Sequence, residues 1–182
     1  MRKLVVSMFL TLDGVMEAPD QWHGAYFDDE MGATVGAQMA ASDALLLGRV
    51  TYEGFAAAWP NMADEPGADH MNGSAKYVVS TTLDKAEWNN STVLSGNLAD
   101  EVNRLKQQPG KNITVMGSAT LIQSLMREDL IDEYQLLIDP VIIGSGKRLF
   151  QDGLDHKALT LVDSKTFSTG VLYLTYRPAH QA

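Results

Sequence analysis

The sequence predicts an α/β protein in which a mostly parallel β-sheet is covered by helices on both faces and ends in antiparallel strands. Short apolar runs rich in branched residues alternate with stretches of helical periodicity, which is the pattern of repeated strand–helix–strand units. Several of these runs are continuous rather than alternating, as is typical of strands buried on both faces. The expected strands are residues 4–10, 44–47, 77–80, 92–94, 113–116, 134–138, 159–162 and 171–176.

Four helices are expected between these strands, because their apolar residues recur at intervals of three and four. The four sets are Met31, Val35 and Met39 within 30–41; Tyr52, Phe55 and Ala56 within 51–58; Leu98, Val102 and Leu105; and Leu121, Ile122, Leu125 and Met126. Asn97 is the expected N-cap of the third helix, and Ser118 or Thr120 that of the fourth. The last two strands are expected to form a hairpin. Residues 19–29 and 60–73 are expected to be irregular loops, functional or mobile at this length.

The chain of 182 residues has the length of one domain, and we expect residues 1–182 to form one domain. It contains no cysteine, which excludes disulfides, zinc–thiolate sites, iron–sulfur clusters and thiol nucleophiles. The 14 Lys and Arg residues against 23 Asp and Glu residues give a formal net charge of −9. A nucleic acid favours a basic surface, so we expect no nucleic-acid partner, whereas a few local donors can still bind a small anion.

The N-terminus, Arg2-Lys3 followed by the apolar run 4–10, has the pattern of a short signal peptide. The run lacks a small-x-small cleavage site and is far shorter than the roughly 20 residues that cross a bilayer. A buried first strand explains the run better. We therefore expect a cytoplasmic protein with no membrane partner.

Two segments share one design, in which a buried strand is followed by a glycine turn and a helix. Gly48 removes the side chain where the backbone would approach a ligand, and Arg49 adds a positive group suited to phosphate. Gly117 is followed in the same way by Ser118 and other small residues at a helix start. Each helix N-terminus contributes about 0.3–1 kcal/mol toward an anion, whereas micromolar binding needs about 8 kcal/mol. The pattern favours a ligand with several phosphates that spans both turns; the alternative is that each glycine only turns the chain.

Several polar residues outside these turns allow two interpretations. Ser80-Thr81 ends a strand, either as a polar strand end or as a hydrogen-bonding partner of a ribose or phosphate. The acidic run 28–30 and the polar group within 64–70 are interpreted as helix caps and loop residues rather than as metal ligands, so no metal site is predicted. His156 and His180 are expected at the surface.

The loop 19–29 carries three aromatic residues and a histidine. Trp22, Tyr26 and Phe27 form either an aromatic wall for a flat heterocycle or an internal packing contact of the loop. His23 is expected at the surface of this loop, and contact with a substrate is the alternative.

Four motifs occur in a fixed order between residues 3 and 177. They are Thr11-Leu12-Asp13-Gly14, Gly48-Arg49-Val50-Thr51-Tyr52-Glu53, Val115-Met116-Gly117-Ser118, and Asp132-Glu133-Tyr134 with Pro140 through Phe150. The ordered set resembles the dihydrofolate reductase superfamily, and in particular the reductase domain of bacterial riboflavin biosynthesis, the RibD C-terminal type. This resemblance implies a three-layer α/β/α fold around a central, mostly parallel sheet of eight strands with an antiparallel C-terminal hairpin.

The resemblance also implies that NADPH is the cofactor and that the protein is a homodimer. The residues that it assigns to the cofactor are Gly48, Arg49, Val50, Thr51, Ser80, Thr81, Gly117, Ser118, Ala119, Thr120 and Leu121. Asp13 is the expected catalytic residue, which either orients the substrate or supplies a proton. The residues expected near the substrate are Gly14, Val15, Trp22 and Phe27.

The chain departs from the family pattern in three places, and the third separates it from dihydrofolate reductases themselves. Thr81 stands where many relatives carry a basic residue, and Gly117-Ser118 replaces a Gly-Gly pair. The apolar face of the first helix lacks the carboxylate that binds the pterin ring in those enzymes. We therefore expect an NADPH-dependent reductase that acts on a small heterocycle or a C=N or C=O group, similar to 5-amino-6-(5-phosphoribosylamino)uracil reductase or dihydrofolate reductase. The alternative is a non-catalytic NADP(H)-binding module.

Overall fold

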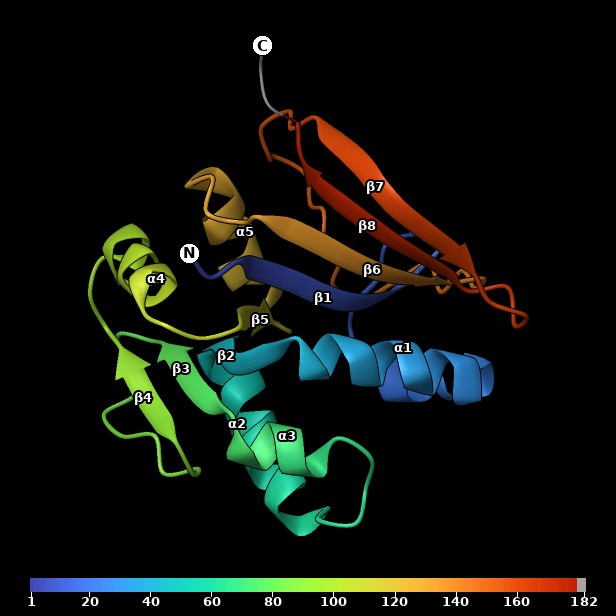
Figure 1. The fold of residues 1–182 in the computed structure, drawn as a ribbon. Coiled ribbons are helices and arrows are strands. Elements are labelled where there is room, and N and C mark those ends of the chain that lie inside the picture. The colour runs from blue at the N-terminus through green and yellow to red at the C-terminus, as the bar shows by residue number, and fades with distance from the viewer. Residues whose placement is uncertain (180–182) are drawn as a thin grey trace.

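Within residues 1–179, which the computed structural model describes, a sheet of eight strands runs through the molecule (Figure 1). The strands lie in the order β4-β3-β2-β5-β1-β6-β8-β7. Their bounds are β1 Leu4–Thr11, β2 Ser42–Gly48, β3 Ala75–Val79, β4 Ser91–Leu94, β5 Asn112–Val115, β6 Glu133–Asp139, β7 Leu159–Thr166 and β8 Leu172–Pro178. His180, which was expected at the surface, lies outside the described residues, whereas His156 is exposed.

The pairing of the strands confirms the predicted sheet. The six strands from β4 to β6 in the sheet order are parallel to their neighbours, whereas β8 is antiparallel to both β6 and β7. The predicted hairpin joins β7 to β8, and the Phe167 N–H donates to the Val171 carbonyl at 2.9 Å in its turn. Each expected strand is present, with small differences at its ends.

Helices cover both faces of the sheet (Figure 1). The connections β1–β2 and β2–β3 run toward one edge of the sheet, and β4–β5 and β5–β6 run back, so right-handed crossovers place their helices on opposite faces. One layer holds α1 Asp29–Ala40, α2 Arg49–Ala58 and α3 Ala68–Gly73, and the other holds α4 Leu98–Gln107 and α5 Ala119–Arg127. No helix within the described residues is long and apolar enough to cross a membrane.

The strand side chains alternate between the two layers, as the period of two requires. On β1, Val6 and Leu10 pack into the larger core beneath α4 and α5. Phe9 points to the opposite face and packs against the cluster of Met31 and Leu137 beneath α1. The face of the sheet that carries α1 is therefore the face on which Phe9 lies.

Side-chain caps start three of the helices. Asn97 and Ser118 accept hydrogen bonds from the backbone of the first turns of α4 and α5, which confirms the cap predictions for these helices. Asp28 accepts from the Met31 N–H at 2.8 Å, so the acidic run 28–30 begins α1 as a cap. An N-cap oxygen of this kind satisfies one of the donors that a helix start leaves unpaired.

The prediction that residues 60–73 are irregular was wrong for their last part, which forms α3. This helix has only six residues and contains Asn and Gly, so local propensity does not predict it. Tertiary contacts stabilise it instead, because Ala68 and Met71 are almost fully buried. The loop 19–29 likewise contains two short 3-10 helices, Pro19–Gln21 and Gly24–Tyr26.

The end of α3 is held by Lys76, the first buried side chain of β3. Lys76 is fully buried, and its Nζ donates to the carbonyls of Met71, Asn72 and Ser74 at 2.8–3.0 Å. The same Nζ lies 4.2 Å from the centre of the Trp88 ring, within the range of a cation–π contact. Burial lowers the pKa of Lys76 from its ordinary value of 10.5 to about 8.

This pKa predicts how stability changes with pH. Because the unfolded chain holds the Lys76 proton more tightly than the folded chain does, the contribution of Lys76 to the free energy of unfolding rises between about pH 8 and 10.5. Denaturant unfolding of the wild type and Lys76→Met at pH 8.0–9.5 is expected to diverge by up to about 1.4 kcal/mol per pH unit. Lys85→Met, at an exposed lysine, is expected to follow the wild type; equal slopes for all three proteins would contradict the prediction.

Candidate active site

The two glycine turns meet at the edge of the sheet where the parallel strands end. Because β2 and β5 are neighbours, the turns after them lie side by side, and the Gly48 N–H donates to the Gly117 carbonyl at 3.2 Å. A Cβ on Gly48 would lie 2.6 Å from Ser118 Oγ, and a Cβ on Gly117 would lie 2.9 Å from Thr51 Oγ1. Neither position has room for a side chain. The glycines are therefore required by the contact between the turns.

The helices that follow the turns present their N-termini at this edge. Gly48 is the N-cap of α2, and no side chain caps this end, so the first N–H groups of α2 are left to solvent or a ligand. At the start of α5, Ser118 accepts from Leu121 N–H, while Thr120 is exposed and Ala119 is buried. Two helix N-termini beside each other form a site suited to an anion with more than one phosphate.

The remaining residues predicted to bind the cofactor lie beside this pair of turns. Arg49 is exposed, and its Nη1 donates to both carboxylate oxygens of Glu53 at 3.1 and 3.2 Å. Ser80 follows β3, the neighbour of β2, and its Oγ accepts from the N–H groups of Thr82 and Leu83, so this oxygen is engaged within its own turn. Thr81 is exposed at the same place.

Asp13 lies in the turn after β1, and backbone groups surround its carboxylate. Oδ1 accepts from the Thr11 hydroxyl at 2.6 Å, and Oδ2 accepts from the Gly144 N–H at 2.8 Å. The hydrogen bond from Thr11, followed by that from Gly144, lowers the pKa of Asp13 to about 2. These hydrogen bonds favour the ionised form of Asp13 at neutral pH; its predicted role, to orient the substrate or to supply a proton, stays a prediction.

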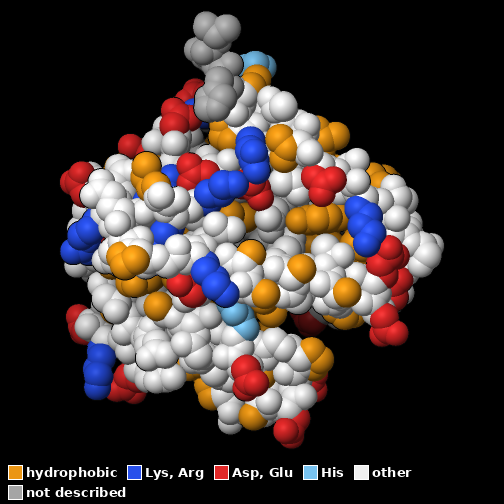
Figure 2. Space-filling view, viewed as in Figure 1, with side chains coloured by type: hydrophobic (Ala, Val, Ile, Leu, Met, Phe, Trp, Pro, Cys, Tyr) orange, Lys and Arg blue, Asp and Glu red, His pale blue; other side chains and the backbone are white. Residues whose placement is uncertain are grey.

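A cavity of about 230 Å³ lies next to these turns, between α1 and the sheet. Phe9, Val35, Met39 and Met116 form apolar parts of its wall, and Met116 directly precedes the Gly117 turn. Figure 2 shows the surface hollowed between α1 and the lobe formed by α2 and α3, with mainly hydrophobic side chains around the hollow. An apolar cavity with a few polar groups beside an anion site is the usual form of a small-ligand site.

Of the four residues predicted near the substrate, Phe27 lines this cavity. Trp22 is half-buried and donates from Nε1 to the Glu17 carbonyl at 3.0 Å, so its indole N–H fixes the loop. Gly14 lies in the Asp13 turn with a φ of 82°, and the Val15 side chain is almost fully buried there. These three residues are not part of the cavity lining.

Polar groups that the sequence analysis missed also line the cavity. Gln38, on the same face of α1 as Val35, has a buried Nε2 atom without a hydrogen-bond partner. Gln135 on β6 donates from Nε2 to Glu133 at 2.8 Å. The residues of α1 at the cavity are Val35, Gln38 and Met39, so no carboxylate of this helix enters it, in agreement with the sequence analysis. The three-residue spacing from Val35 was the available signal for Gln38.

His23 is buried, so the prediction that it lies at the surface was wrong. Its Nδ1 lies 2.7 Å from Oδ2 of Asp139, which is fully buried at the end of β6. The two residues are far apart in the chain, and a pattern confined to neighbouring residues cannot reveal their contact. A carboxylate at the end of an otherwise buried strand was the available signal for Asp139.

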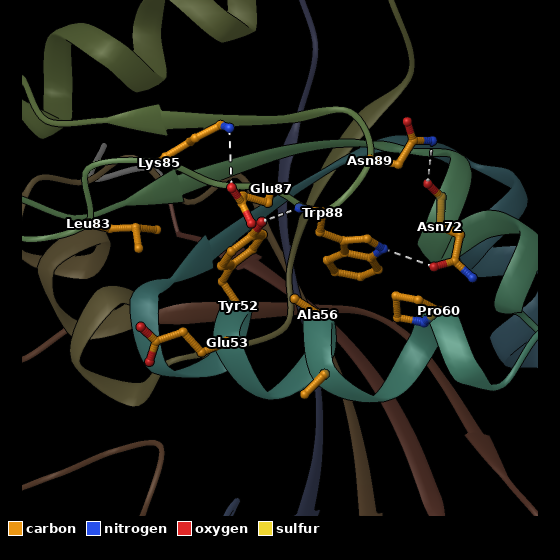
Figure 3. A pocket seen from close by; sticks show the side chains of 11 residues that line it. Tyr52, Glu53, Ala56, Pro60, Asn72, Leu83, Lys85, Glu87, Trp88 and Asn89 are labelled. Atoms are coloured by element: carbon orange, nitrogen blue, oxygen red, sulfur yellow. Dashed lines mark hydrogen bonds and ion pairs between the residues drawn. The ribbon is translucent and has the colours of Figure 1, made fainter.

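A wider groove of about 800 Å³ lies between α2 and the segment 83–89 (Figure 3), and its lining includes Glu53, the partner of Arg49. Trp88 lines it: its backbone N–H donates to the Tyr52 hydroxyl at 2.9 Å, and its indole Nε1 donates to Asn72 Oδ1. The Lys85–Glu87 ion pair of 3.2 Å lies at its rim. None of the predicted cofactor residues lines this groove.

The sheet order, the antiparallel C-terminal strands and the two layers of helices define a dihydrofolate reductase-like fold of the RibD C-terminal type. The family model of the RibD C-terminal domain matches residues 2–173. The chain belongs to this family.

Two curated Bacillus subtilis (strain 168) proteins, both uncharacterized, are similar to this chain over nearly their whole length. YyaP is 32% identical over 182 residues, which cover 96% of this chain and 94% of YyaP. YwjB is 30% identical over 173 residues, which cover 93% of this chain and 95% of YwjB.

Solved structures share the fold at lower sequence identity. A protein from Shewanella sp. PV-4 named for riboflavin biosynthesis matches with a TM-score of 0.78 and 21% identity, over 98% of this chain and 99% of that one. The diaminohydroxyphosphoribosylaminopyrimidine deaminase/5-amino-6-(5-phosphoribosylamino)uracil reductase of Thermotoga maritima matches with a TM-score of 0.70 and 14% identity, over 98% of this chain and 57% of that longer one.

The contact between the turns predicts that alanine substitutions at Gly48 and Gly54 change the free energy of unfolding in opposite directions. Gly48→Ala places a Cβ against Ser118 and is expected to lower the free energy of unfolding by about 1–3 kcal/mol. Gly54→Ala, in the exposed middle of α2 with open space around it, is expected to raise it by up to about 1 kcal/mol. Thermal unfolding of both variants tests this, and a neutral Gly48→Ala would contradict the packing described.

Proposed function

We propose that this protein is an NADPH-dependent reductase that acts on a small heterocyclic substrate or on a C=N or C=O group. The observation that carries this proposal is the contact between two glycine turns, each at a helix N-terminus, beside a mostly apolar cavity. Met116 joins the two parts, because it lines the cavity and precedes Gly117. The Thermotoga maritima protein shares this fold, and its name includes a reductase activity, which supports the proposal.

The residues at the turns fit a dinucleotide. Gly48 and Gly117 leave the backbone accessible, and the uncapped start of α2 offers N–H donors to a phosphate. Arg49 supplies a positive group for the 2′-phosphate that distinguishes NADPH from NADH, with exposed Thr81 nearby in the sheet edge. NADPH, when bound, supplies a hydride; the chain positions the substrate against it and excludes water.

The volume and lining of the cavity limit the size and charge of the substrate. Its volume of about 230 Å³ is smaller than the roughly 300–1,000 Å³ typical of pockets for drug-sized ligands, which favours a single small ring system. Its polar lining includes the carboxamides of Gln38 and Gln135 and no carboxylate. A neutral ring with hydrogen-bonding edges suits this lining better than a cation.

A non-catalytic NADP(H)-binding module is the second candidate. The observations that favour it are the low pKa of Asp13, which disfavours that group as an acid at neutral pH, and the absence of a carboxylate among the α1 residues at the cavity. Both candidates require cofactor binding, and only the reductase consumes NADPH.

Cofactor titration tests the premise that both candidates share. NADPH is expected to quench tryptophan fluorescence and to raise the melting temperature in a concentration-dependent manner. If neither NADPH nor NADH stabilises the protein, both candidates are wrong. With NADPH bound, its consumption in the presence of an aminouracil ribose compound, a pterin or a simple carbonyl compound separates the reductase from the module.

The preference between the two cofactors depends on Arg49. Arg49→Ala is expected to weaken NADPH binding about tenfold, corresponding to about 1.4 kcal/mol, and to leave NADH binding nearly unchanged. Glu53→Gln keeps the arginine and removes the charge that it now pairs with, so this matched variant is expected to bind NADPH at least as tightly as the wild type. Equal losses for the two cofactors in Arg49→Ala would contradict this role.

A further inference from the structure

His70 is the one titratable residue among the described residues that line the cavity beneath α1. It lies on the short helix α3, whereas most of the wall comes from α1 and the sheet. His70 is half-buried, so part of its side chain stays accessible. The other polar residues of the lining are uncharged, and they are Ser7, Gln38, Thr114 and Gln135. The imidazole is therefore the group of this wall that can change its charge.

His70 lies at the end of the cavity remote from the glycine turns. Met116 marks the near end, because it directly precedes Gly117. The helix α1 ends just before β2 begins, so Met39, in its last turn, lies toward the opposite edge of the sheet. A Cβ on Gly67, the N-cap of α3, would lie 3.0 Å from Met39 Cε. The start of α3 thus packs at the far end of the cavity, and His70 follows within one turn.

The contacts of the His70 ring indicate which nitrogen can meet a ligand. Nδ1 lies 3.4 Å from Oγ of Ser74, the C-cap residue of α3. Ser74 is 8% exposed, and a buried hydroxyl that donates its proton to Nδ1 avoids leaving that proton unpaired. The neutral ring then carries its own proton on Nε2. Because Nδ1 is turned toward Ser74, Nε2–H on the other side of the ring is the donor that remains for a ligand in the cavity.

The surroundings of His70 favour the neutral ring. Burial lowers the pKa of His70 from its ordinary value of 6.5, and the charges of Lys76 on β3 and Lys111 just before β5 lower it further. Asp43 on β2 acts in the opposite direction, but the pKa stays lowered. At neutral pH the imidazole is therefore an uncharged hydrogen-bond donor. An uncharged oxygen, such as the carbonyl of a ring, matches this donor better than a cationic group does.

We propose that His70 determines substrate specificity by donating a hydrogen bond from Nε2–H to a carbonyl oxygen of the substrate ring; this inference rests on the proposed reductase function. His70 holds the end of the ring that is remote from the cofactor turns. The other end, with the carbon that accepts the hydride, is thereby directed toward Met116 and Gly117. His70 transfers no proton in this role. It selects a ring that carries a carbonyl over a ring of the same shape without one, because the donor then loses its partner.

Two substitutions that replace different nitrogens of the imidazole test this role. An asparagine amide can take the place of Nδ1 and keep the contact with Ser74, whereas a glutamine amide reaches the place of Nε2. Binding of 5,6-diaminouracil to the complex with NADP⁺ is measured by isothermal titration calorimetry at about pH 8, where His70 is neutral. His70→Asn is expected to weaken binding about tenfold, as for the loss of one hydrogen bond, and His70→Gln at most about threefold.

Two controls accompany these variants. His156→Gln, at an exposed histidine, is expected to bind 5,6-diaminouracil as the wild type does. Circular dichroism and the melting temperature establish that each variant is folded.

A second probe separates recognition of the carbonyl from a general effect on the cavity. The compound 4,5-diaminopyrimidine has a similar ring without a carbonyl, and it is expected to bind the wild type and His70→Asn with equal affinity. If His70 only supported α3 through Ser74, His70→Gln would lose more affinity than His70→Asn, and both probes would be affected alike. Either of these results overturns the role of His70.

The ring nitrogens can also be observed directly. In ¹⁵N-histidine NMR spectra, Nε2 of His70 is expected to carry the proton and to shift when 5,6-diaminouracil is added to the NADP⁺ complex. An unchanged Nε2 signal with the probe bound contradicts the hydrogen bond. If NADPH stabilises the protein but 5,6-diaminouracil does not bind, this inference is wrong and the reductase proposal stands. Failure of NADPH to stabilise the wild type overturns the reductase proposal and, with it, this inference.

Discussion

The insertion of β5 between β2 and β1 is the constraint on which the site depends. The chain reaches β2, β3 and β4 on one side and then returns to place β5 next to β2. Only this return brings the turn at Gly117 against the turn at Gly48. The backbones approach so closely that a single methyl group at either glycine meets the other turn. Two helices from opposite layers thereby direct their N-termini to one place at the sheet edge.

The same arrangement explains how a chain with a net charge of −9 can present an anion site. Backbone N–H groups and helix dipoles carry partial positive charge that does not enter the formal count. Arg49, whose charge does enter it, is paired with Glu53. A negative net charge therefore argues against binding of an extended polyanion, but it does not exclude a compact phosphate site. The proposed phosphate site is local, and its affinity would come from the placement of these groups more than from the number of basic residues.

The sequence predicted the parts of this protein that follow local rules. The order of strands and helices, the Asn97 and Ser118 caps and the terminal hairpin all depend on periodicity or on a few adjacent residues. The helix α3 could not be predicted in this way, because burial and the Lys76 side chain from the next strand stabilise it. His23 was placed at the surface for a related reason: its burial depends on Asp139, 116 positions away. Asp13 was predicted to be a site residue, which stays a prediction; its low pKa comes first from the hydrogen bond of Thr11, two positions away, and then from that of Gly144, which no local pattern connects to it.

The hydrogen bonds around Asp13 lower its pKa, and they also tie together two segments of the chain. Leu12 and Met16 also bond to the backbone of Val141 and Lys147, and Arg148 donates to the Asp13 carbonyl, so the segment after β1 and the segment after β6 are joined at several points. The first of these segments leads to His23, and the second begins at Asp139. These hydrogen bonds couple the two segments mechanically, so they also hold the histidine and its carboxylate at a fixed separation.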